Sequence, residues 1–214
     1  MKINIKGTII PDEDMNIYDH FGIEAVCPKK VRNALDEAKG EDVDVYINSG
    51  GGDVFSANEI YSALRDYDQN TGRVNIHITG FAASAATIVM CAADCDISPP
   101  SMVMIHNVSS RCEGNHRDMQ KQGRTLRDVE KAICKAYTKK TGMSESKLLA
   151  MMDEETWLNS EEAVKLGFCD RIASTKEAFV NSYCTILSDG QRKEYENAKK
   201  KLKAKLKLLE VKVK

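Results

Sequence analysis

The stretch VDVYINSGGGDVFSANEIYSALRDY, residues 43–67, carries the pattern that predicts the fold. Its first six residues indicate a strand, because apolar side chains alternate with polar ones. Three glycines at 50–52 follow, and apolar residues then recur at helical intervals as far as Tyr67. The stretch therefore predicts a strand, a glycine turn and a helix in succession.

The same pattern continues on both sides. Residues 3–10 predict a first strand and residues 27–39 a helix. Further along the chain, residues 73–79 and 102–106 predict two more strands, separated by an apolar and therefore buried helix at 84–93. Strands that alternate with helices predict a parallel α/β core, in which the loops at the carboxyl ends of the strands hold the site.

The following part of the chain is mainly helical. Residues 114–140 show a long helical pattern, and shorter helices are expected to begin at the capping residues Ser144 and Ser160. Residues 111–122 are too polar to be fully buried, so this end of the long helix should face a partner or solvent.

The composition fits one globular domain with an appendage. The chain has 214 residues, of which 42% are hydrophobic and 29% charged, enough to bury a sizeable core. We assign residues 1–175 to the domain and 176–214 to a C-terminal extension. There is no apolar run of about 18 residues, and the N-terminus does not resemble a signal peptide. We therefore expect a cytoplasmic protein that does not enter a membrane.

The extension is strongly basic. Residues 192–214 hold ten Lys or Arg against three Glu, a net charge of +7, so residues 1–191 carry −8 of the chain's net −1. Leu202, Leu206 and Leu209 recur at roughly helical spacing, which predicts a basic amphipathic helix or a flexible tail. Such a segment can stay solvated or dock on an acidic protein surface, and we expect it to bind neither nucleic acid nor membrane.

The cysteines predict free thiols. Seven of them are scattered through apolar segments, without CxxC or zinc-binding Cys/His spacing. We expect a reducing compartment, no metal site and no cofactor. Cys91 and Cys95 lie one helical turn apart near Ser84, so they are either reactive or buried in the core, and we favour burial.

Ser84 and His106 are the candidates for nucleophilic chemistry. Ser84 lies in GFAASAAT, residues 80–87, between a predicted strand and a helix whose first N–H groups are unpaired. A nucleophilic serine needs a base, and among the four histidines His106 alone ends an apolar strand. The structural alternatives are a helix cap for Ser84 and a packed strand-end histidine for His106.

The glycines at 50–52 are candidate donors for an oxyanion. Without a Cβ, their backbone N–H groups can turn toward a ligand. The phosphate-loop pattern GxxxxGKS/T and the dinucleotide pattern GxGxxG are both absent. An ordinary strand-to-helix turn explains the same glycines equally well.

Four segments together resemble the Clp protease proteolytic subunit family: YINSGGGDVFSANEIY, GFAASAAT, MVMIHN and EEAVKLGFCDRI, in this order. The likeness covers residues 3–173 and is strongest to the phage branch, the Clp-like head maturation proteases. It implies the α/β fold that Clp proteases share with crotonases, a superhelical βαβ core with a projecting handle helix at about 114–140.

The resemblance also implies roles for individual residues. Ser84 would be the nucleophile and His106 the general base, with the backbone N–H groups of Gly51 and Ala85 forming the oxyanion hole. Counting back from SEEAVKLGF places Glu155 at the position of the family's catalytic aspartate, and Asp153 is the other candidate for the acid.

For partners, the resemblance implies a protein or peptide substrate and a ring-forming homo-oligomer. The chain begins almost at its first strand, so we do not expect coupling to an ATPase unfoldase. A prophage setting with a capsid or scaffold partner is expected. The alternatives are a crotonase-like acyl-CoA enzyme and a Clp-like assembly protein that has lost activity.

Overall fold

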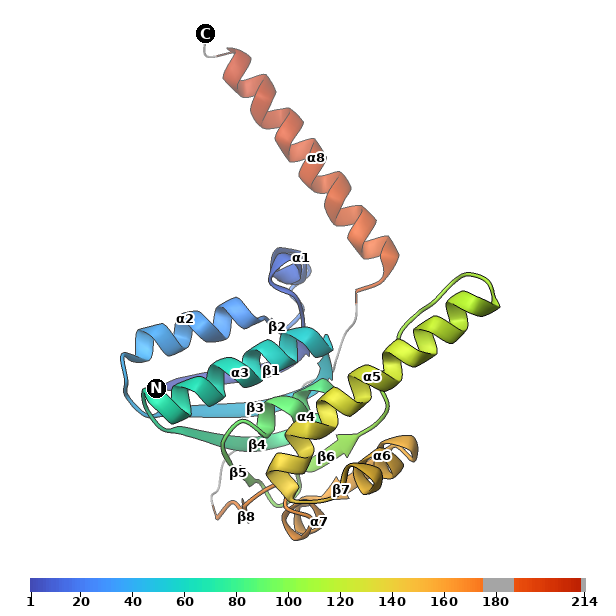
Figure 1. Ribbon diagram of the computed structural model, residues 1–214. Helices are drawn as coiled ribbons and strands as arrows, with labels where there is room; N and C mark the ends of the chain where they lie inside the picture. The colour runs from blue at the N-terminus through green and yellow to red at the C-terminus, as the bar shows by residue number, and fades with distance from the viewer. Residues whose placement is uncertain (175–186, 213–214) are drawn as a thin grey trace.

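The computed structural model describes residues 1–174 and 187–212, with side chains as far as residue 201 (Figure 1). The strands are β1 (Lys2–Ile9), β2 (Ala25–Val26), β3 (Val43–Gly52), β4 (Val74–Ala83), β5 (Asp94–Ile97), β6 (Met102–Ile105), β7 (Thr156–Asn159) and β8 (Arg171–Ile172). The helices are the 3₁₀ turn η1 (Asp12–Asp14), α1 (Met15–His20), α2 (Pro28–Ala38), α3 (Val54–Asn70), α4 (Ala85–Met90), α5 (His116–Thr141), α6 (Glu145–Asp153), α7 (Ser160–Lys165) and α8 (Asp189–Lys212).

The strands form one mixed sheet in the order β2-β1-β3-β4-β5-β8. All neighbours on this path are parallel, which confirms the predicted α/β class. β4 is long enough to pair with two strands in succession, first with β5 and then, beyond a change of register, with β6. Because Ala83 pairs with Met104, the ends of β4 and β6 lie side by side, and the residues that follow them meet.

Two short strands, β5 and β7, were absent from the sequence prediction. β5 and β7 have only four residues each, too few for a clear alternation of apolar and polar side chains. β7 pairs antiparallel with β6, which places Thr156 opposite Ile105. This pairing brings the segment that contains the candidate acids to the edge of the sheet near His106.

Local sequence explains where the helices begin and end. Pro28 occupies the first turn of α2, and Asp53 caps α3 by accepting a hydrogen bond of 2.7 Å from the Ser56 N–H. Gly142 ends α5 in the left-handed conformation. At α7 the prediction was wrong by one residue, because the capping residue is Asn159 and not Ser160.

The main core lies between the sheet and the helices α3 and α4, with Ile47, Ile76 and Ile88 among its buried side chains. Helices α2 and α3 cover one face of β1, β3 and β4 (Figure 1). The alternate residues of these strands are only half-buried, Tyr46 and His77 among them. The sheet thus has one apolar face and one polar face.

Two helices extend from this body (Figure 1). In α5 the buried residues are Ile133, Cys134 and Tyr137, while Met119 near its N-terminal end is 44% exposed, so this end projects as predicted. α8 contacts the body at its first turns, where Arg192 donates two hydrogen bonds of 3.0 Å to Asp14. The predicted leucine stripe at 202, 206 and 209 lies outside the described side chains.

No helix in residues 1–174 or 187–212 combines the length and the apolar character that crossing a membrane requires.

Candidate active site

Ser84 lies at a strained turn between β4 and α4. Its φ is 54° and its ψ is −128°, a conformation that costs a non-glycine residue about 1–3 kcal/mol and must be held by its surroundings. The Ser84 N–H donates to the Met104 carbonyl at 2.9 Å, and the Thr87 N–H donates to the Ser84 carbonyl at 3.0 Å. The hydroxyl is therefore presented at the end of the strand by a backbone that is fixed on both sides.

His106 follows directly after β6, the strand that runs beside the end of β4. Its Nε2 lies 2.7 Å from Ser84 Oγ, within hydrogen-bond distance. The pairing of the two strands thus brings together two residues that sequence reasoning chose separately. A neutral imidazole in this position can accept the serine proton as the hydroxyl attacks a substrate.

The glycine turn after β3 lies against the serine turn. Gly51 has a φ of +92°, and a Cβ at this position would stand 2.7 Å from both the Ala85 nitrogen and the Ala83 carbonyl oxygen. Only glycine permits this approach. The Gly51 N–H donates to Ser49 Oγ at 3.1 Å, whereas Gly52 lines the cavity beside Ser84. The structure therefore adds Gly52 to the candidate oxyanion donors.

The candidate acids lie near His106, but in the described residues neither is hydrogen-bonded to it. Asp153 accepts a hydrogen bond of 2.7 Å from the Asn107 side-chain amide. Glu155 accepts one of 3.4 Å from the Trp157 indole N–H. Ile105 and Thr156 form the last pair of β6 and β7, so His106 and Glu155 each lie one residue beyond it, with Glu155 in the left-handed conformation. Both carboxylates therefore have a partner, that of Asp153 at the shorter distance, and Glu155 stands nearer to the last strand pair beside His106.

A cavity of about 60 Å³ opens beside the serine. It is lined by Gly52, Val54, Ser84, Ala85, Ile88, His106, Asn107, Val108, Ser109, Ile133 and Tyr137. Its wall mixes apolar side chains with polar groups, and the polar groups make up the larger part of it. Within the described part of the chain, Asn107 Oδ1 is the one buried side-chain oxygen or nitrogen that has no hydrogen-bond partner.

The two cysteines near Ser84 are buried, as favoured from the sequence. Burial raises the pKa of the Cys91 thiol to about 12, so this thiol stays protonated and unreactive at neutral pH. The pKa of Cys95 is also raised, first by its hydrogen bond to Cys169 and then by burial. The described residues contain no group of three or more His, Cys, Asp or Glu side chains placed to hold a metal ion.

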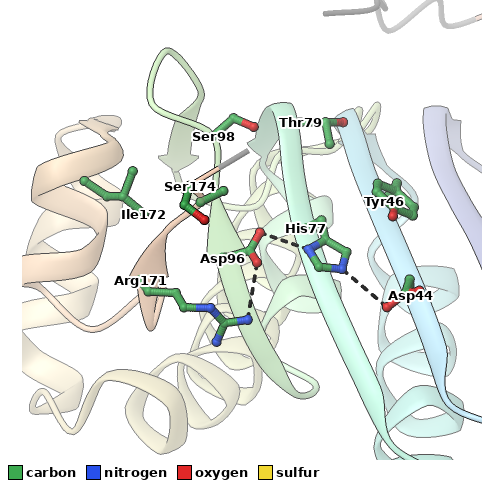
Figure 2. Close-up of a pocket in the computed structure, with 10 residues that line it drawn as sticks. Asp44, Tyr46, His77, Thr79, Asp96, Ser98, Arg171, Ile172 and Ser174 are labelled. Carbon is green, nitrogen blue, oxygen red and sulfur yellow. Dashed lines mark hydrogen bonds and ion pairs between the residues drawn. The ribbon is translucent and has the colours of Figure 1, made fainter. Parts of the chain in front are cut away.

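A second, larger cavity of about 340 Å³ lies over the polar face of the sheet. Its side chains come from β3, β4, β5 and the region of β8 (Figure 2). His77 stands in its middle, with Nδ1 2.9 Å from Asp96 and Nε2 3.5 Å from Asp44. Arg171 lies 3.3 Å from the other Asp96 oxygen. The residues that line this cavity are all different from those that line the cavity beside Ser84.

Sequence reasoning missed two side chains that contact the Ser84 turn. Thr87 was included in an apolar helix and Tyr137 in the apolar stripe of the long helix, and both are buried. Their hydroxyl groups lie 2.6 Å apart. A buried Tyr on an apolar stripe does need a hydrogen-bond partner, but no local pattern identifies a partner fifty residues away.

The fold and the site define an α/β protein with a serine–histidine pair at a strand-to-helix turn. Comparison with known proteins then identifies the family: the model of the Clp protease family matches residues 28–176. The chain belongs to this family.

Three ATP-dependent Clp protease proteolytic subunits illustrate the relationship. One from Bacteroides fragilis is 28% identical over 140 residues, which are 64% of this chain and 66% of the relative. One from Deinococcus radiodurans is 27% identical over 135 residues, or 62% and 65% of the two chains. Proteolytic subunit 2 of Tropheryma whipplei is 27% identical over 150 residues, or 69% and 81%. The chain thus spans just under two thirds of the length of the first two relatives.

Proposed function

We propose that this protein is a serine endopeptidase of the Clp type. The observation that carries the proposal is the 2.7 Å contact between His106 Nε2 and Ser84 Oγ at a strained turn. Membership of the Clp protease family supports it. The substrate class we propose is a protein or peptide.

The reaction proceeds in two halves. Ser84 Oγ attacks the carbonyl carbon of the scissile bond while its proton passes to His106 Nε2. The His106 imidazolium then donates this proton to the leaving amine, the C–N bond breaks and an acyl-serine remains. In the second half His106 takes a proton from water, the resulting hydroxide attacks the ester, and the proton returns to Ser84 Oγ.

Backbone donors stabilise the oxyanion that forms in each half. Ala85 follows the nucleophile at the start of α4, and the glycine turn packs directly against it. Gly51 is the donor predicted from the sequence. We add Gly52, because it borders the cavity while the Gly51 N–H already donates to Ser49.

Glu155 is our proposed third member of the triad. A carboxylate behind His106 would hold the imidazole in the required tautomer and stabilise its protonated form. The register of β6 and β7 supports Glu155 over Asp153, whose carboxylate binds Asn107. In this proposal Glu155 turns from Trp157 to His106 in the active state.

The biological setting that we propose is prophage capsid maturation in the cytoplasm, with the protein acting as a homo-oligomeric ring. The projecting end of α5 supports self-association, because its side chains lie away from the body of the subunit. The basic segment at 192–214 would dock on an acidic capsid or scaffold protein.

The test is labelling with a fluorophosphonate, which reacts with activated serines without needing the natural substrate. Peptide mass spectrometry should locate the adduct on Ser84, and the adduct should be lost in Ser84→Ala and strongly reduced in His106→Ala. Ser62→Ala is the matched control, because the Ser62 hydroxyl is exposed and bonds only within α3. Absence of the adduct in folded wild-type protein would overturn the proposal.

A second candidate is an assembly protein of the same family that has lost activity. The observation in its favour is that neither Glu155 nor Asp153 is hydrogen-bonded to His106 among the described residues. An assembled, folded particle with an unreactive Ser84 would support it.

A further inference from the structure

Two hydroxyl groups connect the nucleophile turn to the long helix α5. Thr87 Oγ1 lies 2.5 Å from the Ser84 carbonyl oxygen, and on its other side it lies 2.6 Å from the Tyr137 hydroxyl. Thr87 is fully buried and Tyr137 is 3% exposed, so water does not compete for these contacts. The three groups form a continuous chain from α5 to the backbone of Ser84.

The donor and the acceptor in each of these hydrogen bonds follow from the chemistry of the three groups. The Ser84 carbonyl can only accept, so the single hydroxyl hydrogen of Thr87 is donated to it. The Thr87 oxygen must then accept from Tyr137, whose O–H is the remaining donor. Burial raises the pKa of Tyr137, so this O–H stays protonated at neutral and moderately alkaline pH.

This series of hydrogen bonds from Tyr137 through Thr87 ends on Ser84, the strained residue. Ser84 is held through its N–H by Met104 on the strand that precedes His106, and through its carbonyl by Thr87. The orientation of that carbonyl determines the ψ of Ser84 and therefore the direction in which α4 leaves the turn. A small rotation there would change the position of Oγ relative to His106 Nε2, which a proton transfer does not tolerate.

We propose that Tyr137 is a positioning residue for Ser84 that acts through Thr87. The proposal rests on the proposed function, because it assigns to Tyr137 a part in keeping Ser84 reactive. The Tyr137 ring also lines the cavity, but its hydroxyl is occupied by Thr87. Replacing Tyr137 by Phe therefore removes the hydrogen bond and leaves the cavity wall in place.

The experiment measures the inactivation kinetics of the full chain with a fluorophosphonate in four single variants and one double variant. Tyr137→Phe removes the distal donor, Thr87→Val removes both contacts of the threonine hydroxyl, and Thr87→Ser restores that hydroxyl. The matched control is Tyr67→Phe. Tyr67 is also buried, and its hydroxyl donates to the Glu41 carbonyl and accepts from the Gly40 N–H. Tyr67 is not among the residues that line the cavity beside Ser84. The melting temperature of each variant is recorded in parallel.

We expect Tyr137→Phe to lower the maximal inactivation rate about 3- to 10-fold, because one buried hydrogen bond is lost. The reagent concentration that gives half of the maximal rate should stay unchanged. Thr87→Val should lower it at least as much, and Thr87→Ser should retain the wild-type rate. The double variant Thr87→Val, Tyr137→Phe should be no slower than Thr87→Val alone, because Tyr137 acts only through Thr87. Tyr67→Phe should lower the melting temperature but keep the rate.

Three results would overturn the proposal. Wild-type rates in Tyr137→Phe and Thr87→Val would leave the proposed function intact and remove the positioning role. A rate loss in Tyr67→Phe that matches the loss in Tyr137→Phe would show that both variants act through stability. A folded wild-type protein that does not react at all would overturn the proposed function, and the positioning role with it.

Discussion

His106 and His77 each line a cavity, and their surroundings are opposite. His106 meets a neutral serine hydroxyl at 2.7 Å. His77 stands between two carboxylates, with Asp96 at 2.9 Å and Asp44 at 3.5 Å (Figure 2). The hydrogen bond that His77 Nδ1 donates to Asp96 is the main cause that raises the pKa of His77, and the charges of both carboxylates add to it.

The difference shows which histidine suits general-base chemistry. A base must offer a free lone pair to the proton of its substrate, and His106 faces the hydroxyl that would give up its proton. Both nitrogens of His77 face carboxylates, which favour the protonated ring. Position on the strand already separates the two residues, because His77 lies inside β4 and His106 follows the end of β6, and the neighbours on adjacent strands show why.

The largest expected effect is the loss of fluorophosphonate labelling when His106 is removed, and the removal of His77 is the comparison. His106→Ala should lower the second-order rate of fluorophosphonate labelling by about 10³-fold or more, because it removes the proposed base. His77→Ala should leave this rate within about 2-fold, since His77 has no contact with Ser84. Stopped-flow or gel-based labelling kinetics measure both, and similar losses in the two variants would remove the distinction drawn between the histidines.

The acids provide the next test. Glu155→Gln should lower the labelling rate about 10²-fold or more, because an amide cannot stabilise the protonated His106 as a carboxylate does. Asp153→Asn should lower it less than about 3-fold, because its side-chain oxygen can still accept from Asn107. The reverse order of the two effects would make Asp153 the acid.

A smaller effect is expected on the titration of His77. Asp96→Asn removes the largest cause of its raised pKa and should move that pKa downward, while the Asp44 contact remains. An NMR titration of the histidine ring protons measures the shift. A His77 pKa unchanged in Asp96→Asn would show that the ring is governed by burial or by Asp44.

The smallest expected effect is the contribution of His77 to the pH dependence of the free energy of unfolding. The folded-state pKa of His77 is raised above its unfolded value of about 6.5, so its interactions stabilise the fold fully below that pH and less as pH rises through the folded pKa. We measure the free energy of unfolding of wild type and His77→Gln with denaturant. The difference between the two proteins should be larger at pH 6 than at pH 9, and the change in this difference should be less than about 1 kcal/mol. A difference that grows with pH would contradict the assignment.

Much of the fold could be predicted because its signals are local. The alternation around Val45 and Val74 and the stripes of α3 and α5 recur over a whole element, so they predict parallel strands and covering helices. The four-residue strands β5 and β7 have no such repetition. They exist because β4 and β6 offer them free edges, and this depends on the assembled sheet.

For the site too, local sequence indicates some of the residues and only tertiary contacts identify the others. Ser84 and His106 were accessible from the sequence, because each ends a strand, and parallel strands present their carboxyl ends at one edge. The choice between Gly51 and Gly52 depends on the hydrogen bond of the Gly51 N–H to Ser49 and on the place of Gly52 at the cavity. The choice between Glu155 and Asp153 depends on the register of β7 and on the partner that Asp153 finds in Asn107. None of these follows from residue type.

The sequence by itself determined the α/β class, the choice of Ser84 and His106 as candidates and the projecting long helix, because these depend on short-range periodicity and on where strands end. Only the tertiary structure decided that His77 is enclosed by carboxylates from β3 and β5, and that the Tyr137 hydroxyl reaches Thr87. Contacts of this kind join residues on different elements. Side-chain hydrogen bonds require specific distances and directions, and only the packed chain sets these.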